Sequence, residues 1–173
     1  MDGTGLMTEA IKLLLFPAMM AFAASSDLLT MTIPNRVSLM MVGGFMLLAV
    51  ATGMSMEQAA FHAGAGLLVL AIAFGFFACG WIGGGDAKLA ATTALWLGFD
   101  HLLDYALYGS LFGGALTLLL LQFRAVPLPA VLVGRAWAER LHQPGGGVPY
   151  GIALAAAALV VYPSTPWMHG IGM

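Results

Sequence analysis

Charged side chains are scarce in this sequence. Asp, Glu, Lys and Arg together make up 8% of the 173 residues, and 61% of the residues are hydrophobic, whereas about a quarter of an ordinary soluble domain is charged. The six Lys and Arg are scattered and the net charge is -2, so the basic stripe that nucleic acid requires is missing. The composition therefore predicts a membrane protein without a nucleic-acid partner.

Cysteine is almost absent as well. Cys79 is the single cysteine, which excludes an internal disulfide and a Cys-x-x-Cys zinc or redox site. The four His show no metal-ligand spacing, and the sequence has no Gly-x-x-x-x-Gly-Lys-Ser/Thr phosphate-binding loop. We therefore expect neither a metal nor another cofactor.

Long apolar runs fill most of the chain, and short polar stretches divide them at the spacing of membrane-spanning helices of about 20 residues. This pattern predicts an all-α fold, a polytopic membrane bundle of about six transmembrane helices that form a single domain over residues 1–173. The predicted helices cover residues 6–26, 34–54, 58–82, 86–99, 102–123 and 148–167. The fourth is only about 21 Å long, which places its first residue, Asp86, slightly below the membrane surface.

The charges alternate between successive connections of these helices. One set of connections holds all the basic residues of the loops, namely Arg36, Lys88, Arg124, Arg135 and Arg140, and the other set holds Glu57, Asp100 and Asp104. By the positive-inside rule the basic set is cytoplasmic, and both termini are then outside. Residues 124–147 are a candidate for an amphipathic helix on the cytoplasmic face, with no role assigned. A signal peptide over residues 13–24 is the alternative at the N-terminus, but Glu9 precedes it where a signal peptide is basic.

The junction of the third and fourth predicted helices reads Gly83-Gly84-Gly85-Asp86. Glycines let neighbouring helices and an extended peptide approach closely, and an aspartate at a helix N-terminus accepts its free N–H groups. The segment suits the floor of a protease site. The alternative is a glycine-rich turn in which Asp86 only caps the helix.

A second acid, Asp27, ends the first predicted helix on the same cytoplasmic side. Ionisable residues at membrane depth are expensive and usually serve a site. Two adjacent carboxylates cannot both ionise readily, so they share a proton. The ionised member can then take a proton from water while its neutral partner hydrogen-bonds a scissile carbonyl. Asp27 and Asp86 are therefore a candidate catalytic pair, and two unrelated helix caps are the alternative.

Three segments resemble the type IV prepilin peptidases, membrane aspartyl proteases of the Gly-x-Gly-Asp class. They are Asp27-Leu28 followed by Ile33-Pro34-Asn35, then Gly83 to Lys88, and Pro149-Tyr150-Gly151. The resemblance implies that Asp27 and Asp86 cleave the basic leader peptide of a prepilin or pseudopilin at the cytoplasmic face of the bacterial inner membrane. It also implies residues of the active-site loop or near the substrate: Gly83, Gly85, Lys88, Pro34, Asn35, Pro149, Tyr150 and Gly151.

The sequence departs from this family in two respects. Residues 28–32 are uncharged, whereas this stretch is often basic in the family. Larger members carry an N-terminal domain with paired Cys-x-x-Cys motifs and methylate the new N-terminus, and nothing here corresponds to that domain. The chain thus resembles the short, peptidase-only kind of tight-adherence (Flp) pilus systems, without methyltransferase activity. The partners it implies are the substrate, membrane lipid and pilus-assembly proteins.

Two functions of other classes remain as alternatives. A small ion-coupled transporter would use the acids as ion carriers, and should place them near the membrane midplane. A non-catalytic scaffold for pilus assembly would use them only as helix caps. We expect Asp100 and Asp104 to be solvated at the outer face, and His62 to be hydrogen-bonded between helices. The segments 80–84 and 109–113 have the glycine spacing of close helix contacts.

Overall fold

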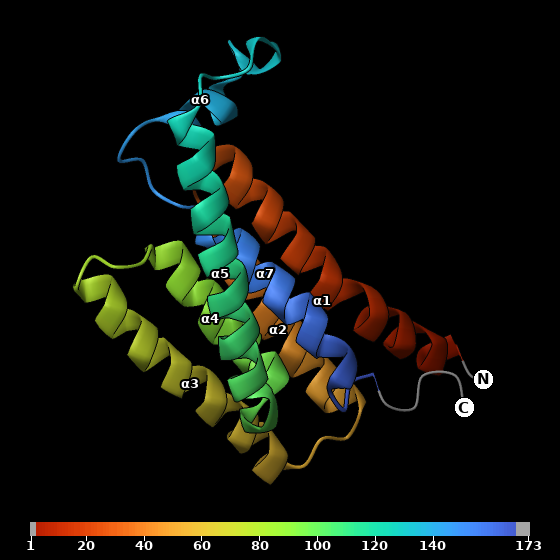
Figure 1. The fold of residues 1–173 in the computed structure, drawn as a ribbon. Helices are drawn as coiled ribbons and strands as arrows, with labels where there is room; N and C mark the ends of the chain where they lie inside the picture. The colour runs from red at the N-terminus through yellow and green to blue at the C-terminus, as the bar shows by residue number, and fades with distance from the viewer. Residues whose placement is uncertain (1–2, 169–173) are drawn as a thin grey trace.

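The computed structural model describes residues 3–168, and this part of the chain contains helices and no strands (Figure 1). The α-helices are α1 (Gly3–Thr30), α2 (Asn35–Ala51), α3 (Met56–Ala78), α4 (Gly84–Leu97), α5 (Leu102–Ala125), α6 (Ala136–His142) and α7 (Tyr150–Val161). Three short 3-10 helices join them, η1 (Phe99–His101), η2 (Ala130–Leu132) and η3 (Tyr162–Ser164). The all-α prediction is confirmed.

Within residues 3–168, three helical segments are long and apolar enough to cross a membrane, namely Thr8–Thr30, Met56–Ala78 and Phe99–Ala125. Two shorter apolar segments accompany them, Asn35–Ala51 and Tyr150–Ser164. The protein is therefore a membrane protein. Crossing of the bilayer by all six predicted helices, with both termini outside, stays a prediction.

The helix ends differ from the predicted ones where local chemistry was misjudged. α1 continues past Ser25 to Thr30. The hydroxyls of these two residues each donate to the carbonyl oxygen four residues earlier, at 2.7 Å in each case, so these polar residues do not break the helix. α7 stops at Val161 and the chain tightens into η3, because Pro163 has no backbone N–H to continue the hydrogen bonds of the helix. Because α1 extends to Thr30, Asp27 lies one turn inside this helix and not at its end.

Helix α4 lies at the centre of the bundle. It packs against α2, α3 and α7, while α7 also packs against α1 and α5. Figure 1 shows that the long helices α1 and α5 extend past the first turn of α4 toward the end of the molecule that carries α6. The short helices α2, α4 and α7 all begin at this end of the bundle, so their N-termini come together between longer neighbours.

An aromatic core holds the opposite end together. The rings of Phe16 and Tyr162 stack with centroids 4.2 Å apart. The Trp96 indole N–H donates to the carbonyl of Met41 at 2.9 Å, and the Trp167 indole N–H donates to the carbonyl of Trp96 at 2.7 Å. Each buried indole thus has the partner that its N–H requires. This core fixes α1, α2, α4 and α7 relative to one another, and so sets the height at which their other ends meet.

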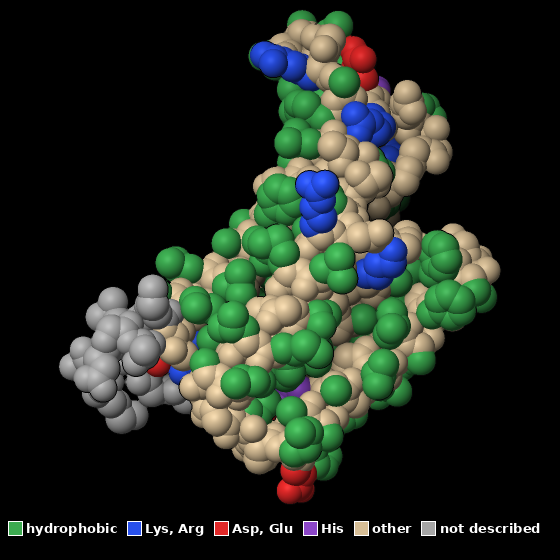
Figure 2. Space-filling view, turned by 180° about the vertical axis from the view of Figure 1, so that it is seen from behind, with side chains coloured by type: hydrophobic (Ala, Val, Ile, Leu, Met, Phe, Trp, Pro, Cys, Tyr) green, Lys and Arg blue, Asp and Glu red, His purple; other side chains and the backbone are tan. Residues whose placement is uncertain are grey.

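Arginines fasten the segment between α5 and α7. The Arg124 guanidinium donates to the carbonyls of Leu141 and Gly147, both at 2.7 Å, and Arg140 donates to the carbonyl of Leu29 at 2.9 Å. The predicted amphipathic helix is realised only as the seven-residue α6. Figure 2 shows most of the visible Lys and Arg side chains in the half of the molecule that carries α6, and many hydrophobic side chains on the rest of the surface.

Candidate active site

Asp27 is a buried acid that α7 holds in place. Its side chain is 5% exposed, and its Oδ2 atom accepts the backbone N–H of Gly151 at 2.8 Å. Gly151 is the second residue of α7, where the first N–H groups of a helix have no partner within the helix. The positive end of the helix dipole also favours a carboxylate there. Asp27 therefore binds a helix N-terminus that is 124 residues away in the sequence.

Asp86 approaches the same helix start from α4. It lies in the first turn of α4, two residues after the helix begins, and Gly83 is the capping residue. The interpretation of Asp86 as a simple N-cap is thus replaced by a place inside the first turn. Its carboxyl group lies beside the backbone N–H groups of Gly83 and Gly151, and within electrostatic range of Asp27. Both carboxylates therefore converge on the N–H of Gly151.

The glycines around the two acids leave no room for side chains. A Cβ atom on Gly151 would lie 2.8 Å from Oδ2 of Asp27 and 2.7 Å from Cδ1 of Ile33, and one on Gly83 would lie 3.1 Å from Oδ2 of Asp86. A Cβ atom on Gly85 would lie 3.2 Å from Cβ and 3.3 Å from the backbone N of Ile33. Gly85 and Gly151 therefore allow close approach between segments, whereas Gly83 makes room for the carboxyl group of Asp86 in its own segment.

Gly84 differs from its neighbours. The atoms nearest to a Cβ atom there belong to the ring of Phe77, the closest at 3.3 Å, and a ring can turn aside. Gly80, in the same segment, has a positive φ of 74° and nothing within 4 Å of such an atom, so it serves the turn after α3. The predicted close helix contact at residues 80–84 is therefore limited to Gly84.

Lys88 and Asn35 meet at the edge of the site. The ammonium group of Lys88 donates to the side-chain oxygen of Asn35 at 2.8 Å. Asn35 is the first residue of α2, and Pro34, in extended conformation, precedes it as the capping residue. The hydrogen bond therefore ties the start of α2 to the start of α4 and brings together two residues that the sequence placed near the substrate. Ile33, next to them, packs against both Gly85 and Gly151.

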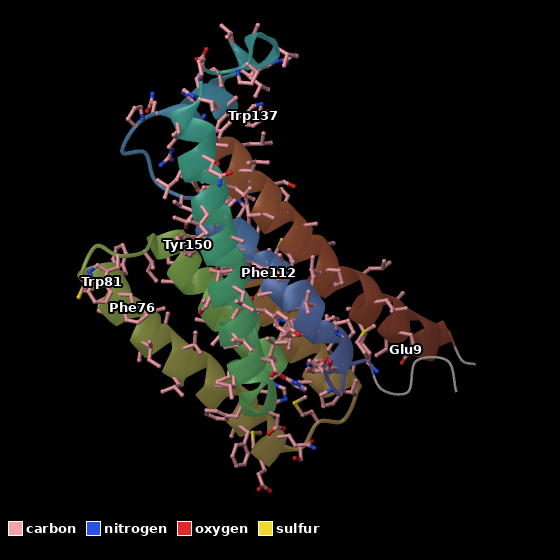
Figure 3. The ribbon with its side chains drawn as sticks, in the orientation of Figure 1. Glu9, Phe76, Trp81, Phe112, Trp137 and Tyr150 are labelled. Carbon is pink, nitrogen blue, oxygen red and sulfur yellow. The ribbon has the colours of Figure 1, made fainter. Side chains whose placement is uncertain are left out.

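Tyr150 and Pro149 shape the start of α7. Pro149 is fully buried and precedes the helix. The ring of Tyr150 lies over Gly113 of α5, where a Cβ atom would be 2.6 Å from the ring. The glycine spacing at 109–113 thus does bring two helices together, since Gly109 also faces Leu154 of α7. In Figure 3, Tyr150, Phe76 and Trp81 lie toward one end of the bundle, whereas Glu9 lies near the far end of α1.

A cavity of about 550 Å³ opens beside Asp86. Its walls come from α3, α4, α5 and α7, and they are formed mainly by apolar side chains such as Val69, Ile72, Phe76, Leu102 and Leu154. Asp86, Tyr105, Ser110 and Tyr150 are polar residues of the lining. The cavity thus extends from Asp86 between α3, α5 and α7.

The remaining acids and the histidine lie away from this site. Asp100 and Asp104 are exposed at the other end of the bundle, in η1 and the first turn of α5. His62 makes a hydrogen bond of 2.8 Å between its Nδ1 atom and the carbonyl of Leu95, which confirms an interhelical role. Within residues 3–168 no group of three or more His, Cys, Asp or Glu is placed to hold a metal ion.

Two features of the site were not predicted from the sequence. The role of Ile33 as the side chain between two glycines follows from a tertiary contact, although its place beside Pro34 and Asn35 was a signal. The participation of α5, through Tyr105 and Gly113, had no signal beyond the glycine spacing. Both features depend on which faces of the helices pack against each other, and a local sequence pattern does not determine this packing.

A model of the type IV leader peptidase family matches residues 14–118, a stretch that includes most of α1 and α5, all of α2 to α4, and both aspartates. No curated protein sequence and no solved structure matches the chain.

Proposed function

Because the chain belongs to the type IV leader peptidase family, we propose that it is an aspartic endopeptidase that removes the basic leader peptide from type IV prepilin-like substrates. The observation that supports this proposal best is the convergence of Asp27 and Asp86 on the backbone N–H of Gly151. Neither a pair of unrelated helix caps nor a scaffold requires that convergence.

The proposed mechanism uses one proton shared between the two carboxyl groups. The ionised carboxylate takes a proton from water, and the resulting hydroxide adds to the carbon of the scissile carbonyl. The protonated carboxyl donates a hydrogen bond to the carbonyl oxygen, which becomes negative as the tetrahedral intermediate forms. The C–N bond then breaks while the leaving nitrogen accepts a proton from the pair. The Gly151 N–H holds Asp27 in position throughout.

The proposed orientation places this site at the cytoplasmic face of the bacterial inner membrane. Five of the six basic residues lie at the end that carries the site and α6: Arg36, Lys88, Arg124, Arg135 and Arg140. Lys12, the sixth, lies at the other end and forms an ion pair with Glu9 at 3.2 Å. The positive-inside rule then makes the site end cytoplasmic, with α1 to α5 and α7 crossing the membrane. A prepilin leader lies on this side while its apolar helix stays in the bilayer.

The apolar cavity supports the proposed substrate class. An apolar substrate helix can lie along walls such as Val69, Ile72 and Leu154 without exposing them to water, and Asp86 lies where such a helix would reach the carboxylate pair. The transporter alternative predicts acids near the midplane. Here both acids lie within a turn or so of the helix ends at one side of the bundle, which favours an interfacial protease.

Cleavage of a purified substrate tests the proposed function. The protein is incubated in detergent or lipid with a prepilin of a tight-adherence (Flp) pilus, the proposed setting, and mass spectrometry identifies the products. We expect one cut between the basic leader and the apolar helix. With S-adenosylmethionine present, the new N-terminus should stay unmethylated. Absence of cleavage for a panel of prepilins and pseudopilins would contradict the proposal.

Cysteine labelling tests the orientation. In a Cys79→Ser background, single cysteines at Thr30 and His142 should react with an impermeant maleimide from the cytoplasmic side, and one at Met56 from the outside, because the charges alternate in this way. Thr30 and Met56 are exposed in the structure. His169, also expected outside, lies beyond the described residues. Labelling of Thr30 from outside would place the carboxylate pair in the wrong compartment.

A further inference from the structure

Tyr105 is a buried hydroxyl that the proposed mechanism does not use. It lies in the first turns of α5, is 4% exposed, and lines the same cavity as Asp86. Its hydroxyl is close to Thr93 and within electrostatic range of Asp86. Among residues 3–168 it has no partner at hydrogen-bond geometry.

A buried hydroxyl without a partner is destabilising, because it loses its hydrogen bonds to water and gains none in return. Phenylalanine would fill the same space without that loss. Another hydroxyl of the cavity wall, that of Ser110, already donates to the carbonyl of Ala106 at 2.7 Å. The O–H of Tyr105 is therefore a donor that remains free to bind a molecule in the cavity.

The position of Tyr105 indicates which part of a substrate it would meet. Thr93 lies seven residues after Asp86 in α4, which is about 10 Å along the helix. A substrate helix that runs from the carboxylate pair along α4 therefore reaches this level about one to two turns beyond the cleaved bond. The backbone carbonyls of such a helix already accept an N–H within the helix. A polar side chain in an apolar cavity has no such partner, so it gains more from the Tyr105 hydroxyl than a carbonyl does.

We propose that Tyr105 is a specificity-determining residue, whose hydroxyl donates a hydrogen bond to a polar acceptor side chain on the apolar helix of the substrate, one to two turns after the cleaved bond. Because an unpaired acceptor is costly in an apolar environment, the pairing would fix which residue of the helix lies at this level, and hence which bond reaches Asp27 and Asp86. This proposal rests on the proposed function, since it requires a substrate helix in the cavity.

The test combines an enzyme variant with a set of substrates. Prepilin-like peptides carry an otherwise apolar helix with leucine or glutamine at each of the positions in the second and third turns. Cleavage by the unaltered protein, by Tyr105→Phe and by Tyr108→Phe gives kcat/KM for every pair. Tyr108 is the control because it lies on the same helix but is 36% exposed, with its ring stacked on Phe112.

The unaltered protein should prefer glutamine over leucine at one position by about twofold to about twelvefold, the range expected for one added hydrogen bond. Tyr105→Phe should lose this preference and cleave the all-leucine substrate as well as the unaltered protein does, whereas Tyr108→Phe should keep it. The thermal stability of Tyr105→Phe should be equal or higher, because no hydrogen bond of the folded protein is removed.

Three results would overturn the proposal: a preference that survives in Tyr105→Phe, an equal loss of activity on all substrates, or a loss that only follows lower stability. Binding of the same peptides, measured in detergent by fluorescence, separates this proposal from the proposed function. A Tyr105-dependent binding preference without cleavage would contradict the proposed protease function and support the proposed hydrogen bond of Tyr105. Cleavage that depends on both aspartates but shows no preference for glutamine would support the protease function and contradict the proposed role of Tyr105.

Discussion

Asp27→Asn and Asp86→Asn should each reduce leader cleavage to background, a loss of at least about a hundredfold and up to about ten-thousandfold. An amide has nearly the shape of the carboxyl group but cannot take or give the shared proton, so either substitution removes the acid-base pair as a unit. Initial rates with a purified prepilin in detergent or lipid give the measurement. Both variants should still insert and fold, because asparagine at position 27 retains a carbonyl oxygen for the N–H of Gly151.

Asp100→Asn and Asp104→Asn are the matched controls. They make the same chemical change at exposed positions at the opposite end of the bundle, and they should leave the rate within about twofold, as surface substitutions away from a site usually do. The cleavage rates are compared at equal amounts of the four variant proteins in the membrane. Near-normal turnover by either Asp27→Asn or Asp86→Asn would contradict the assignment of these two aspartates as the catalytic pair.

Gly151→Ala should have the second largest effect, a loss of roughly a hundredfold or more in kcat/KM. The added methyl group would lie 2.8 Å from Oδ2 and 3.1 Å from Cβ of Asp27, and 2.7 Å from Cδ1 of Ile33. These neighbours belong to buried residues, so the methyl group has to push Asp27 away from the N–H that holds it. A displacement of about 1 Å in a catalytic group can lower the rate about a hundredfold.

The control for Gly151→Ala is another helical glycine. Gly43→Ala in α2 meets nothing within 4 Å and should retain full activity, with stability unchanged or raised by up to about 1 kcal/mol. Thermal stability and initial rate are measured on the same preparations. If Gly151→Ala cleaves at half the normal rate or better, the contact between α7 and Asp27 is not part of the active site.

The glycine motif should respond in a graded way. Gly85→Ala should reduce cleavage and Gly85→Val should remove it, because the added atoms press on Cβ and the backbone N of Ile33, at 3.2 and 3.3 Å. Gly84→Ala should be milder, because the nearest atoms belong to the ring of Phe77, which can turn aside. Equal activity of Gly84→Ala and Gly85→Ala, or a loss that only follows stability, would assign these glycines to the turn.

The sequence alone was sufficient for the fold class and for the family. Apolar runs of membrane length, separated by short polar stretches, identify the helices because burial in lipid requires every backbone group to be bonded within its own segment. Helix existence is therefore a local property. The helix ends differ from the predicted ones at α1 beyond Ser26 and at α7 before Pro163. Hydroxyls bonded back to the helix and a following proline without an N–H each act over a single turn, which the apolar pattern does not register.

The sequence also indicated which residues belong to the site, through the acids at one side and the three segments that resemble the family. What it left open was the arrangement. Only the tertiary structure brings the N–H of Gly151 to Asp27 across 124 residues, places Ile33 between two glycines, and turns Tyr105 into the cavity beside Asp86. These contacts depend on the rotation and height of each helix relative to its neighbours. That choice is made by the packing of whole helix faces and of the aromatic core, and not by any local pattern of residues.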